Sequence, residues 1–457
     1  MLVQQNPGHD PTSDRDRENS YQREGVTGTR QSPGPPRIAP RGQFGAILSR
    51  PLGAPTHPTS RTHATGANCE IGTASTPPYT AAMEVGIDAS RAFQPEPTGI
   101  GVYTTEVISR LMAAPPAPLR LYVNRRTPPS SAPPLSPGSS WRCIPLPRAW
   151  TVVRLRGELR RRPPQLLWMP AYRLPPGRLP RSVVTVHGVE HRFAPHAYPS
   201  AESAQVEAFV VDTLRRASRV ITPSETTKAD LVNLFAADPD SITVIPHGIS
   251  EALRPLTEER FLPLLRDLGV EPPYFLTVGA HHRRKNVPFL IDQFARAFPP
   301  DDLSGVQMVV TNAGGEVGRG LLEQANRLGL GGRVVALDHV AGERLAALYS
   351  GATGACVASL YEGFGLPALE GMACGAPVLA NSVGGVQEIA QGAALLVESD
   401  DPEGWVEAFH RLLWEPGLRA HLRGLGVARA AGFSWERSAE AHSVLLANEL
   451  RLAAEKS

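Results

Sequence analysis

Two glutamates, Glu362 and Glu370, enclose seven residues in the stretch YEGFGLPALE, residues 361–370. The preceding run GACVAS is typical of a buried strand, the glycines indicate a turn, and Pro367 suits the first turn of a helix. A helix N-terminus presents free N–H groups and a positive dipole end, which can hold a phosphate or a sugar hydroxyl. An acid–base carboxylate pair at a glycosidic bond must converge within roughly 5 to 10 Å. This spacing instead favours two carboxylates that bind different parts of one extended polyol; the alternative is two ordinary glutamates near a helix start.

A basic loop follows a second apolar run. The loop HHRRKN at 281–286 comes after YFLTVGA at 274–280 and offers Arg283, Arg284 and Lys285. A phosphate leaving group gains negative charge as its bond breaks, so cations placed at a strand end would stabilise that charge without a metal. The alternative is a solvated surface loop.

Two further segments place polar or flexible residues at strand ends. His187 ends SVVTVHG, where its imidazole could donate a hydrogen bond to a hydroxyl, although a structural histidine is the alternative. Gly99 and Gly101 in PTGIGVYT precede a helix and permit close backbone approach, but the third glycine of a dinucleotide fingerprint is missing. His247 in IPHG is interpreted as a turn residue near a hinge.

Length and composition limit the class of protein. A chain of 457 residues is too long for one ordinary core, which favours two domains, and a net charge of +2 argues against nucleic acid as the partner. The four cysteines, Cys69, Cys143, Cys356 and Cys374, lack metal-ligand spacing and fit a reducing compartment. No stretch approaches the ~20 apolar residues of a spanning helix. We expect a cytoplasmic protein without a metal site, at most peripheral to a membrane.

Strand-like and helix-like segments alternate twice along the chain, which predicts an α/β fold. Residues 1–82 are rich in Pro, Gly, Ser, Thr and Arg and are expected to be a disordered extension, with Met83 a candidate translation start. We predict two facing, doubly wound, Rossmann-like parallel-sheet domains with a ligand at the carboxyl ends of their strands. The expected parts are a first domain at 83–250, a linker at 251–273, a second domain at 274–432 and a C-terminal helix at 433–457.

Beyond these patterns, ASLYEGFGLPALEGMACGAPVLANSVGG strongly resembles the E-x7-E signature of the family 4 retaining glycosyltransferases, which have the two-domain GT-B fold. Other segments match in the expected order: GIDASRAFQPEPTGIGVYTTEVISRL, SVVTVHG, ASRVITPSETTKADL, ITVIPHGI and VGAHHRRKNVPFLIDQFA. The resemblance covers roughly Met83 to the C-terminus. It implies an acceptor on the first domain and a nucleotide-sugar donor on the second.

The resemblance also implies roles for individual residues. Glu370 would bind the ribose hydroxyls and Glu362 would lie beside the donor sugar. Lys285 would stabilise the leaving diphosphate, and His187 would lie near the reacting sugar. Many relatives carry an arginine where this chain has Ala280, so either Arg283 or Arg284 would supply the second cation. Backbone contacts to the donor would come from two glycine-containing loops, at Gly99 and Gly101 and at Gly363, Phe364, Gly365 and Leu366.

We therefore predict a retaining, metal-independent glycosyltransferase without a cofactor. It would move a hexose, with mannose favoured by the RKN-type loop, from GDP-mannose or a UDP-sugar to a hydroxyl of a glycan or lipid-linked acceptor. One alternative is a catalytically silent nucleotide-sugar or glycan-binding protein of the same fold. Another is a different GT-B chemistry, such as epimerisation or a pyridoxal-phosphate phosphorylase, against which the E-x7-E string speaks.

A basic helix is predicted within RAWTVVRLRGELRRRPP, residues 148–164. Val152, Leu155 and Leu159 fall on one stripe amid arginines, which would allow peripheral contact with anionic lipid. The alternative is a surface helix whose apolar stripe packs against the protein.

Overall fold

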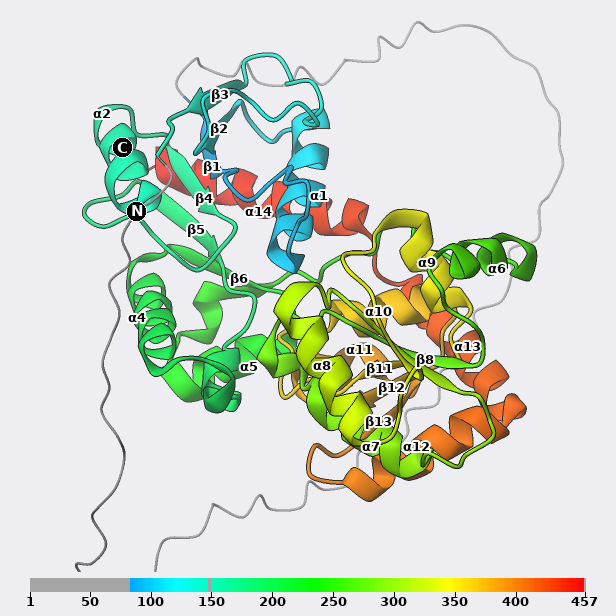
Figure 1. Ribbon diagram of the computed structural model, residues 1–457. Coiled ribbons are helices and arrows are strands. Elements are labelled where there is room, and N and C mark those ends of the chain that lie inside the picture. The colour runs from blue at the N-terminus through cyan, green and yellow to red at the C-terminus, as the bar shows by residue number, and fades with distance from the viewer. Residues whose placement is uncertain (1–82, 147–148, 456–457) are drawn as a thin grey trace, which may run out of the picture. The chain divides into compact units, whose positions relative to one another are not determined.

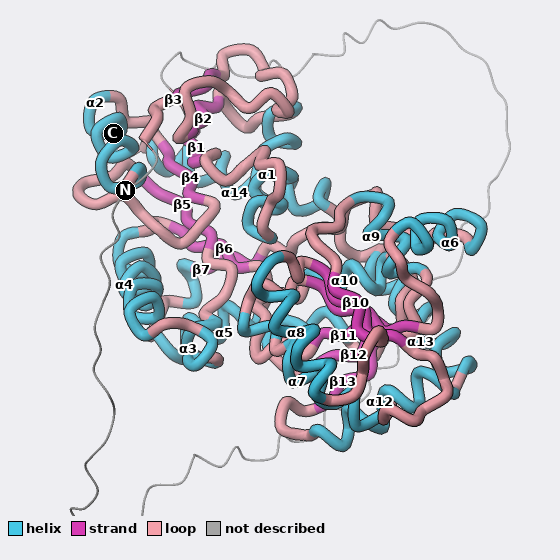
Figure 2. Tube along the Cα trace, in the orientation of Figure 1, coloured by secondary structure: helices cyan, strands magenta, loops and turns pink. Residues whose placement is uncertain are grey.

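The computed structural model describes residues 83–146 and 149–455. The expectations of a disordered extension at 1–82 and of a start at Met83, together with any role of Cys69, fall on residues outside that part or at its edge. The described residues form two parallel sheets, each with its own helices (Figures 1 and 2). The prediction of two doubly wound α/β domains is confirmed.

The first sheet has seven strands in the order β3-β2-β1-β4-β5-β6-β7, and neighbouring strands run parallel. The central strand β4, LLWM, is apolar and buried along its whole length, as a strand covered on both faces requires. The winding direction reverses between β1 and β4, so a ligand is expected at the ends of these two strands. The strands are β1 Val85–Asp88, β2 Leu119–Val123, β3 Ser140–Cys143, β4 Leu166–Met169, β5 Arg181–Thr185, β6 Arg219–Thr222 and β7 Ile242–Val244.

The second sheet has six parallel strands in the order β10-β9-β8-β11-β12-β13. Here the winding reverses between β8 and β11, which places the loop after β8 beside the loop after β11. These are the basic loop and the loop that carries Glu362. The strands are β8 Tyr274–Val278, β9 Gln307–Thr311, β10 Val334–Ala336, β11 Gly354–Val357, β12 Val378–Asn381 and β13 Ala394–Val397.

Two helices of the first domain, α1 and α5, begin at side-chain caps. The Thr98 hydroxyl accepts the N–H of Gly101 at the start of α1, and the Ser224 hydroxyl accepts the N–H of Thr227 at the start of α5. The helices are α1 Gly99–Ala113, α2 Arg156–Arg161, α3 Glu190–Phe193, α4 Ser200–Arg216 and α5 Glu225–Phe235.

The remaining helices follow in chain order. The expected linker contains α6, and the helical region after Asp401 is divided at Pro416 into α12 and α13. The helices are α6 Glu258–Asp267, α7 Val287–Ala297, α8 Gly315–Arg327, α9 Gly342–Ser350, α10 Leu366–Ala373, α11 Gly384–Ala390, α12 Pro402–Trp414, α13 Pro416–Ala430 and α14 Trp435–Ala454.

Helix α14 returns to the first sheet, where it lies beside α1 (Figure 1). Trp435, Leu446 and Leu450 of α14 belong to the same buried cluster as Val85 and Tyr103. The side chain of Glu449, almost fully buried, pairs with Arg181 and Arg219 on two strands of the first sheet. The last helix therefore completes the core of the first domain.

The basic segment at 148–164 forms a π-helical turn, Thr151–Leu155, that continues into α2. Leu155 and Leu159 are buried together with Trp150 and Leu174. The predicted apolar stripe thus packs into the protein, which favours the surface-helix alternative over contact of this stripe with lipid. No helix in the described ranges is both long enough and apolar enough to span a bilayer.

Candidate active site

The loops after β8 and β11 meet as the strand order requires. The N–H of Leu360 donates to the carbonyl oxygen of Arg284 at 2.9 Å, which joins the two loops. Arg283 to Lys285 form a single 3-10 turn, and Asn286 ends it in the left-handed region at φ 56°. This turn aims Arg284 and Lys285 at the opposite loop and leaves Arg283 exposed.

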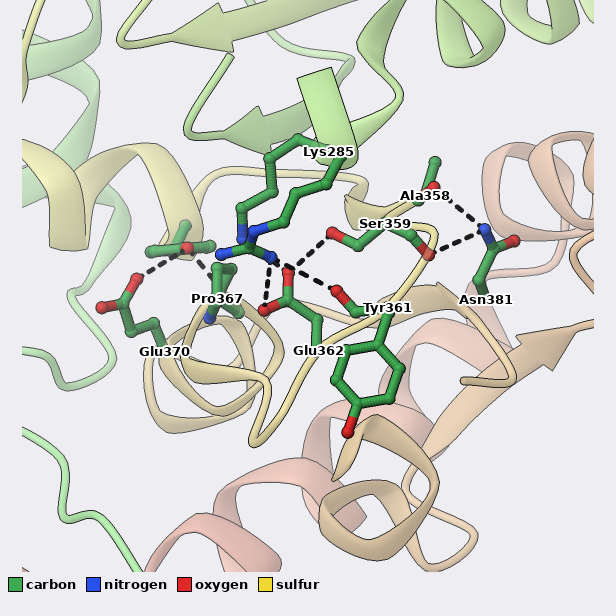
Figure 3. A network of polar contacts seen from close by, with 10 residues as sticks. Lys285, Ala358, Ser359, Tyr361, Glu362, Pro367, Glu370 and Asn381 are labelled. Carbon is green, nitrogen blue, oxygen red and sulfur yellow. Dashed lines mark hydrogen bonds and ion pairs between the residues drawn. The ribbon is translucent and has the colours of Figure 1, made fainter. Parts of the chain in front are cut away.

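Glu362 binds both cations. Lys285 Nζ lies 2.6 Å from Oε1 and Arg284 Nη1 lies 3.0 Å from Oε2 (Figure 3). The Ser359 hydroxyl donates to Oε1 at 2.6 Å. We call Arg284, Lys285 and Glu362 the ion cluster; Glu362 is 5% and Lys285 8% exposed. Arg284 is therefore the arginine that joins Lys285, and Arg283 takes no part.

The ion cluster fixes the charge of its carboxylate. Burial alone would raise the pKa of Glu362, but the charges of Arg284 and Lys285 and the hydrogen bonds to the carboxylate outweigh it and lower this pKa to about 2. Burial lowers the pKa of Lys285, while Glu362 opposes that shift. Glu362 is thus an anion at neutral pH, suited to accept hydrogen bonds and unsuited to donate a proton.

A buried chain of hydrogen bonds holds the loop beneath Glu362. Asn381 Nδ2 donates to the carbonyl oxygens of Ala358 at 2.9 Å and Ser359 at 3.1 Å (Figure 3). Trp405 Nε1 in turn donates to Asn381 Oδ1 at 3.0 Å. Because Asn381 and Trp405 are completely buried, this chain ties the loop to the core of the second domain.

In the view of Figure 3, Glu370 lies on the opposite side of Pro367 from Glu362. Gly365 takes φ 104°, a value that favours glycine, and α10 begins at the next residue with Pro367 in its first turn. The Tyr349 hydroxyl donates to Glu370 Oε2 at 3.0 Å. Burial raises the pKa of Glu370 to about 7, against the opposing effects of Tyr349 and Lys285. The two glutamates therefore lie on the same loop and helix start but differ in ionisation.

Gly363 is one of the residues through which this loop meets the first domain. A Cβ at Gly363 would lie 1.9 Å from the carbonyl oxygen of His187 and 2.9 Å from the Cα of Gly188. The hydroxyls of Ser224 and Thr227 donate to the carbonyl oxygen of Gly363 at 2.6 and 2.9 Å. We call this set the Gly363 contact, and it admits no side chain.

Beside this contact, the ring of Phe364 lies 4.8 Å from that of His247. The glycine loop of the first domain is also near, since a Cβ at Gly99 would lie 3.6 Å from Leu366 Cδ1. The predicted residues of the E-x7-E stretch, His187 and Gly99 are thus brought together.

The imidazole of His187 is directed at protein atoms. Nε2 lies 2.7 Å from the carbonyl oxygen of Pro170 and donates to it, and Nδ1 lies 3.4 Å from Nε2 of His247. Burial lowers the pKa of His187 to about 4, so the ring is neutral at physiological pH. Neither ring nitrogen of His187 is free to donate to a substrate hydroxyl in this arrangement, although the ring lines the site.

Sequence reasoning missed a polar network behind His187. The Tyr103 hydroxyl lies 2.6 Å from Nε2 of His442 and 2.9 Å from the hydroxyl of Thr185. Nδ1 of His442 donates to the carbonyl oxygen of Ser438, so Nε2 accepts the proton of Tyr103. The ring of Tyr103 packs 4.8 Å from that of His187. Tyr103 and His442 are separated by 339 residues, and no local signal relates them.

Glu190 is a second missed residue. Its carboxylate folds over Gly188, where a Cβ would lie 3.0 Å from Oε1 and 3.2 Å from Oε2. Its charge helps to raise the pKa of Arg284. The first domain thus contributes a carboxylate that, like Glu362, acts electrostatically on Arg284. Its position in the loop that follows β5, five residues after Thr185, was the available signal.

No three His, Cys, Asp or Glu side chains within 83–146 and 149–455 gather as a metal ion would require. The positive charge at the site comes from Arg284 and Lys285.

Two family models match the chain in the parts that carry this geometry. The model described as Glycosyltransferase Family 4 matches residues 97–253, and the model described as Glycosyl transferases group 1 matches residues 272–415. A D-inositol 3-phosphate glycosyltransferase from Actinosynnema mirum is 34% identical over 239 residues, which are 49% of this chain and 56% of that protein. O-antigen chain mannosyltransferase B from Escherichia coli is 27% identical over 57% of this chain and 68% of its own length. The chain thus spans little more than half of the Actinosynnema relative.

Solved structures share the fold. Sucrose-phosphate synthase from Thermosynechococcus elongatus has a TM-score of 0.64 at 22% identity, covering 79% of this chain and 98% of that one. Anabaena HepE in complex with UDP-glucose has a TM-score of 0.60 at 16% identity, covering 82% and 100%. WaaG, a glycosyltransferase involved in lipopolysaccharide biosynthesis, has a TM-score of 0.63 at 16% identity, covering 79% and 99%. The expected GT-B fold is confirmed, and the family models support the expected membership of family 4.

Proposed function

We propose that this chain, which carries the matched domains of the family 4 glycosyltransferases, is a retaining enzyme that transfers a hexose from a nucleotide sugar to an acceptor hydroxyl. The observation that carries the proposal is the ion cluster at the start of α10, with Glu370 one helical turn further along. A diphosphate flanked by a sugar and a ribose presents the matching pattern of an anion between two sets of hydroxyls.

The donor would bind across the start of α10. Its diphosphate would meet the N-terminal N–H groups of α10 together with Lys285 and Arg284. The ionised Glu362 would accept hydrogen bonds from the sugar hydroxyls, and Glu370 would accept them from the ribose. The Gly363 contact leaves room for the backbone alone, which suits a loop that must approach both a sugar and the first domain.

The chemical step would break the bond between the anomeric carbon and the diphosphate. Negative charge then develops on the departing phosphate oxygen, where Lys285 and Arg284 are stronger partners in the transition state than in the bound donor. The acceptor hydroxyl would form its bond on the same face, and its proton would pass to the departing phosphate. With its pKa of about 2, Glu362 would not act as a general acid. The two cations supply the charge stabilisation, so we propose a metal-independent reaction.

The identities of the transferred hexose and of the nucleotide base are inferred from similarity to other proteins. The RKN-type loop and the E. coli mannosyltransferase favour GDP-mannose, whereas HepE binds UDP-glucose, so a UDP-sugar is the second candidate. We propose a glycan or a lipid-linked molecule as the acceptor.

The test is thermal stabilisation of the full chain by GDP, UDP, ADP and their sugar conjugates, with Glu370→Ala as the matched variant. A ligand at ~100 times its dissociation constant stabilises a fold by roughly 2.7 kcal/mol. We expect one base to stabilise the wild type and Glu370→Ala to lose most of that shift. The preferred donor would then be assayed for transfer, with the product anomer assigned by NMR. Binding without turnover would favour the silent binding protein, and no stabilisation by any nucleotide would refute the donor site.

A further inference from the structure

A cavity of about 380 Å³ lies in the first domain at the carboxyl ends of β1, β2 and β4. This is the point at which the winding of the first sheet reverses, where an α/β sheet is expected to bind its ligand. Its lining includes Asp88 at the end of β1, Asn124 just after β2 and Met169 at the end of β4. We propose that this cavity holds a phosphate ester carried by the acceptor, with Arg91 and Arg173 as the phosphate-binding residues; the inference rests on the proposed glycosyl transfer.

The cavity adjoins the proposed reaction centre. Met169 and Ala171 line it, and Pro170 between them provides the carbonyl oxygen that accepts the N–H of His187 at 2.7 Å. Gly101 also lines it, two residues from Gly99, which approaches Leu366 at the start of α10. A molecule in the cavity could therefore extend a hydroxyl toward the donor while its other end stays in the first domain.

Two arginines give the cavity its preference for an anion. Within the described residues, neither Arg91 nor Arg173 forms an ion pair, although both line the same cavity. The guanidinium of Arg173 rests 4.6 Å from the ring centroid of Phe209, which fixes its plane. The positive end of the 15-residue helix α1 points to the same place, since Thr98 and Gly101 line the cavity.

The other polar side chains that line the cavity are suited to form hydrogen bonds with the hydroxyls of a ligand. The carboxylate of Asp88 accepts the N–H of Ser90 at 2.9 Å, and burial raises its pKa. Glu96 is exposed, and Asn124 and Thr151 add neutral donors and acceptors. Two arginines beside carboxylate, amide and hydroxyl groups fit a phosphorylated sugar or polyol better than either a bare polyol or a bare phosphate.

The surrounding chain reinforces this choice. Residues 107–189 contain fourteen arginines and no lysine, and their one acid is Glu158, whereas the whole chain has a net charge of only +2. Glu158 is itself paired with Arg142. Arg110, Arg120 and Arg181 pair with Glu106, Glu84 and Glu449, which lie outside this range, whereas the positive charge that remains would raise the local concentration of an anionic acceptor near the first domain. The arginines are at 110, 120, 125, 126, 142, 148, 154, 156, 160, 161, 162, 173, 178 and 181.

The test compares matched probes on the full chain by calorimetry. The soluble probes are mannose 6-phosphate and inositol 3-phosphate, each against its unphosphorylated parent, and the lipid probe is phosphatidylcholine vesicles with and without phosphatidylinositol. We expect a phosphorylated probe to bind at least tenfold more tightly than its parent. Arg91→Gln and Arg173→Gln should each weaken that binding by about 10- to 100-fold. Arg178→Gln, an exposed arginine outside the cavity lining, is the control and should bind normally.

The outcomes separate this inference from the proposed function. Stabilisation by a nucleoside diphosphate is measured first on every variant, which checks both the fold and the donor site. Arginine-dependent binding of a soluble phosphate ester identifies a free acceptor, and arginine-dependent binding of the inositol lipid vesicles alone identifies a lipid-linked one. If the nucleotide stabilises the protein but parents bind as well as phosphate esters, or both arginine variants bind normally, or no phosphate ester binds, the inference is wrong while the donor site stands. Arg173→Lys should recover part of the binding, since it retains the charge.

Discussion

The two sides of the Gly363 contact hold their polar side chains in opposite ways. In the second domain, Glu362 is an anion paired with two buried cations, and the hydrogen bonds of Asn381 hold its loop. In the first domain, the rings packed at this contact, such as His187, are neutral, and their hydrogen bonds end on other protein atoms. The arginines of that domain, Arg91 and Arg173, line the adjoining cavity instead. We call the ion cluster and its loop the ionic side, and the rings of His187, Tyr103 and His442 with their partners the neutral side. The ionic side can stabilise a developing charge, whereas the neutral side can shape the site without competing for that charge. At this contact, the second domain thus supplies the cations and the first domain mainly supplies shape.

The largest effect should come from removing a cation on the ionic side. Lys285→Ala should lower turnover by about 10² to 10³-fold, because it removes a partner of the developing phosphate charge. It should weaken donor binding much less. The matched control is Arg283→Ala, which removes an exposed arginine outside the ion cluster and should change turnover less than about threefold. The turnover of both variants is measured by steady-state kinetics with the preferred donor. Equal losses of turnover in the two variants would contradict the proposed role of the ion cluster.

A smaller loss should follow from disturbing the contact between the two sides. Gly363→Ala places a Cβ 1.9 Å from the carbonyl oxygen of His187, so the loop or the first domain must shift. We expect turnover to fall by about 10²-fold and stability to fall by ~1–3 kcal/mol. Nucleotide binding should persist, because its side chains belong to the second domain. Gly424→Ala in α13, where nothing lies within 4 Å of the new methyl, should instead stabilise by ~0.5–1 kcal/mol. Unchanged kinetics in Gly363→Ala would mean that the Gly363 contact plays no part in turnover.

The pH dependence of donor binding should separate the two glutamates. The pKa of Glu370 is raised to about 7, so its carboxylate is lost as pH falls through 7. Affinity for an intact nucleotide sugar should therefore drop about tenfold below pH 7. In the free protein, folding stability depends on pH in the opposite direction. Because the folded state binds the proton of Glu370 more tightly than the unfolded state does, the contribution of Glu370 to stability falls as pH rises from about 4.5 to 7. Glu370→Gln should flatten both profiles. A profile set by Glu362 would instead change near its pKa of about 2.

The smallest effect should come from the neutral side. Tyr103→Phe removes the hydroxyl between Thr185 and His442, leaving Nε2 of His442 buried without a donor. We expect a loss of about 1–3 kcal/mol in urea unfolding with little change in donor affinity. Tyr172→Phe is the control, because no hydrogen bond of that hydroxyl exists within the described residues, and it should cost less than about 0.5 kcal/mol. A large loss of donor affinity in Tyr103→Phe would mean that the neutral side also binds the donor.

Much of the ionic side could be predicted because its residues are close in sequence to strand ends. Apolar runs indicated β8 and β11, and the reversal of a doubly wound sheet places the loops after such strands together. The strand-end positions, together with the resemblance to the family 4 glycosyltransferases, predicted that Lys285 and Glu362 share one site. It could not show that Glu362 would pair with Lys285 and Arg284 at once, because side-chain pairing depends on rotamers and burial rather than on spacing.

The neutral side resisted prediction because its partners come from distant segments. His187 was identified at its strand end, but its hydrogen bonds to Pro170 and His247 depend on the packing of three separate loops. His442 reaches Tyr103 from the last helix, and nothing in either segment indicates the other. The split of the C-terminal helical region had a visible signal at Pro416, whereas the return of α14 to the first sheet had none.

The course of α14 has a consequence for synthesis on the ribosome. The first domain is translated early, yet three residues that complete its interior and sheet contacts are translated only after the second domain: Trp435, His442 and Glu449. Until those residues leave the exit tunnel, the nascent first domain exposes the apolar surface around Tyr103 that α14 later covers. Chaperones would therefore meet a chain whose second domain can close before its first is complete.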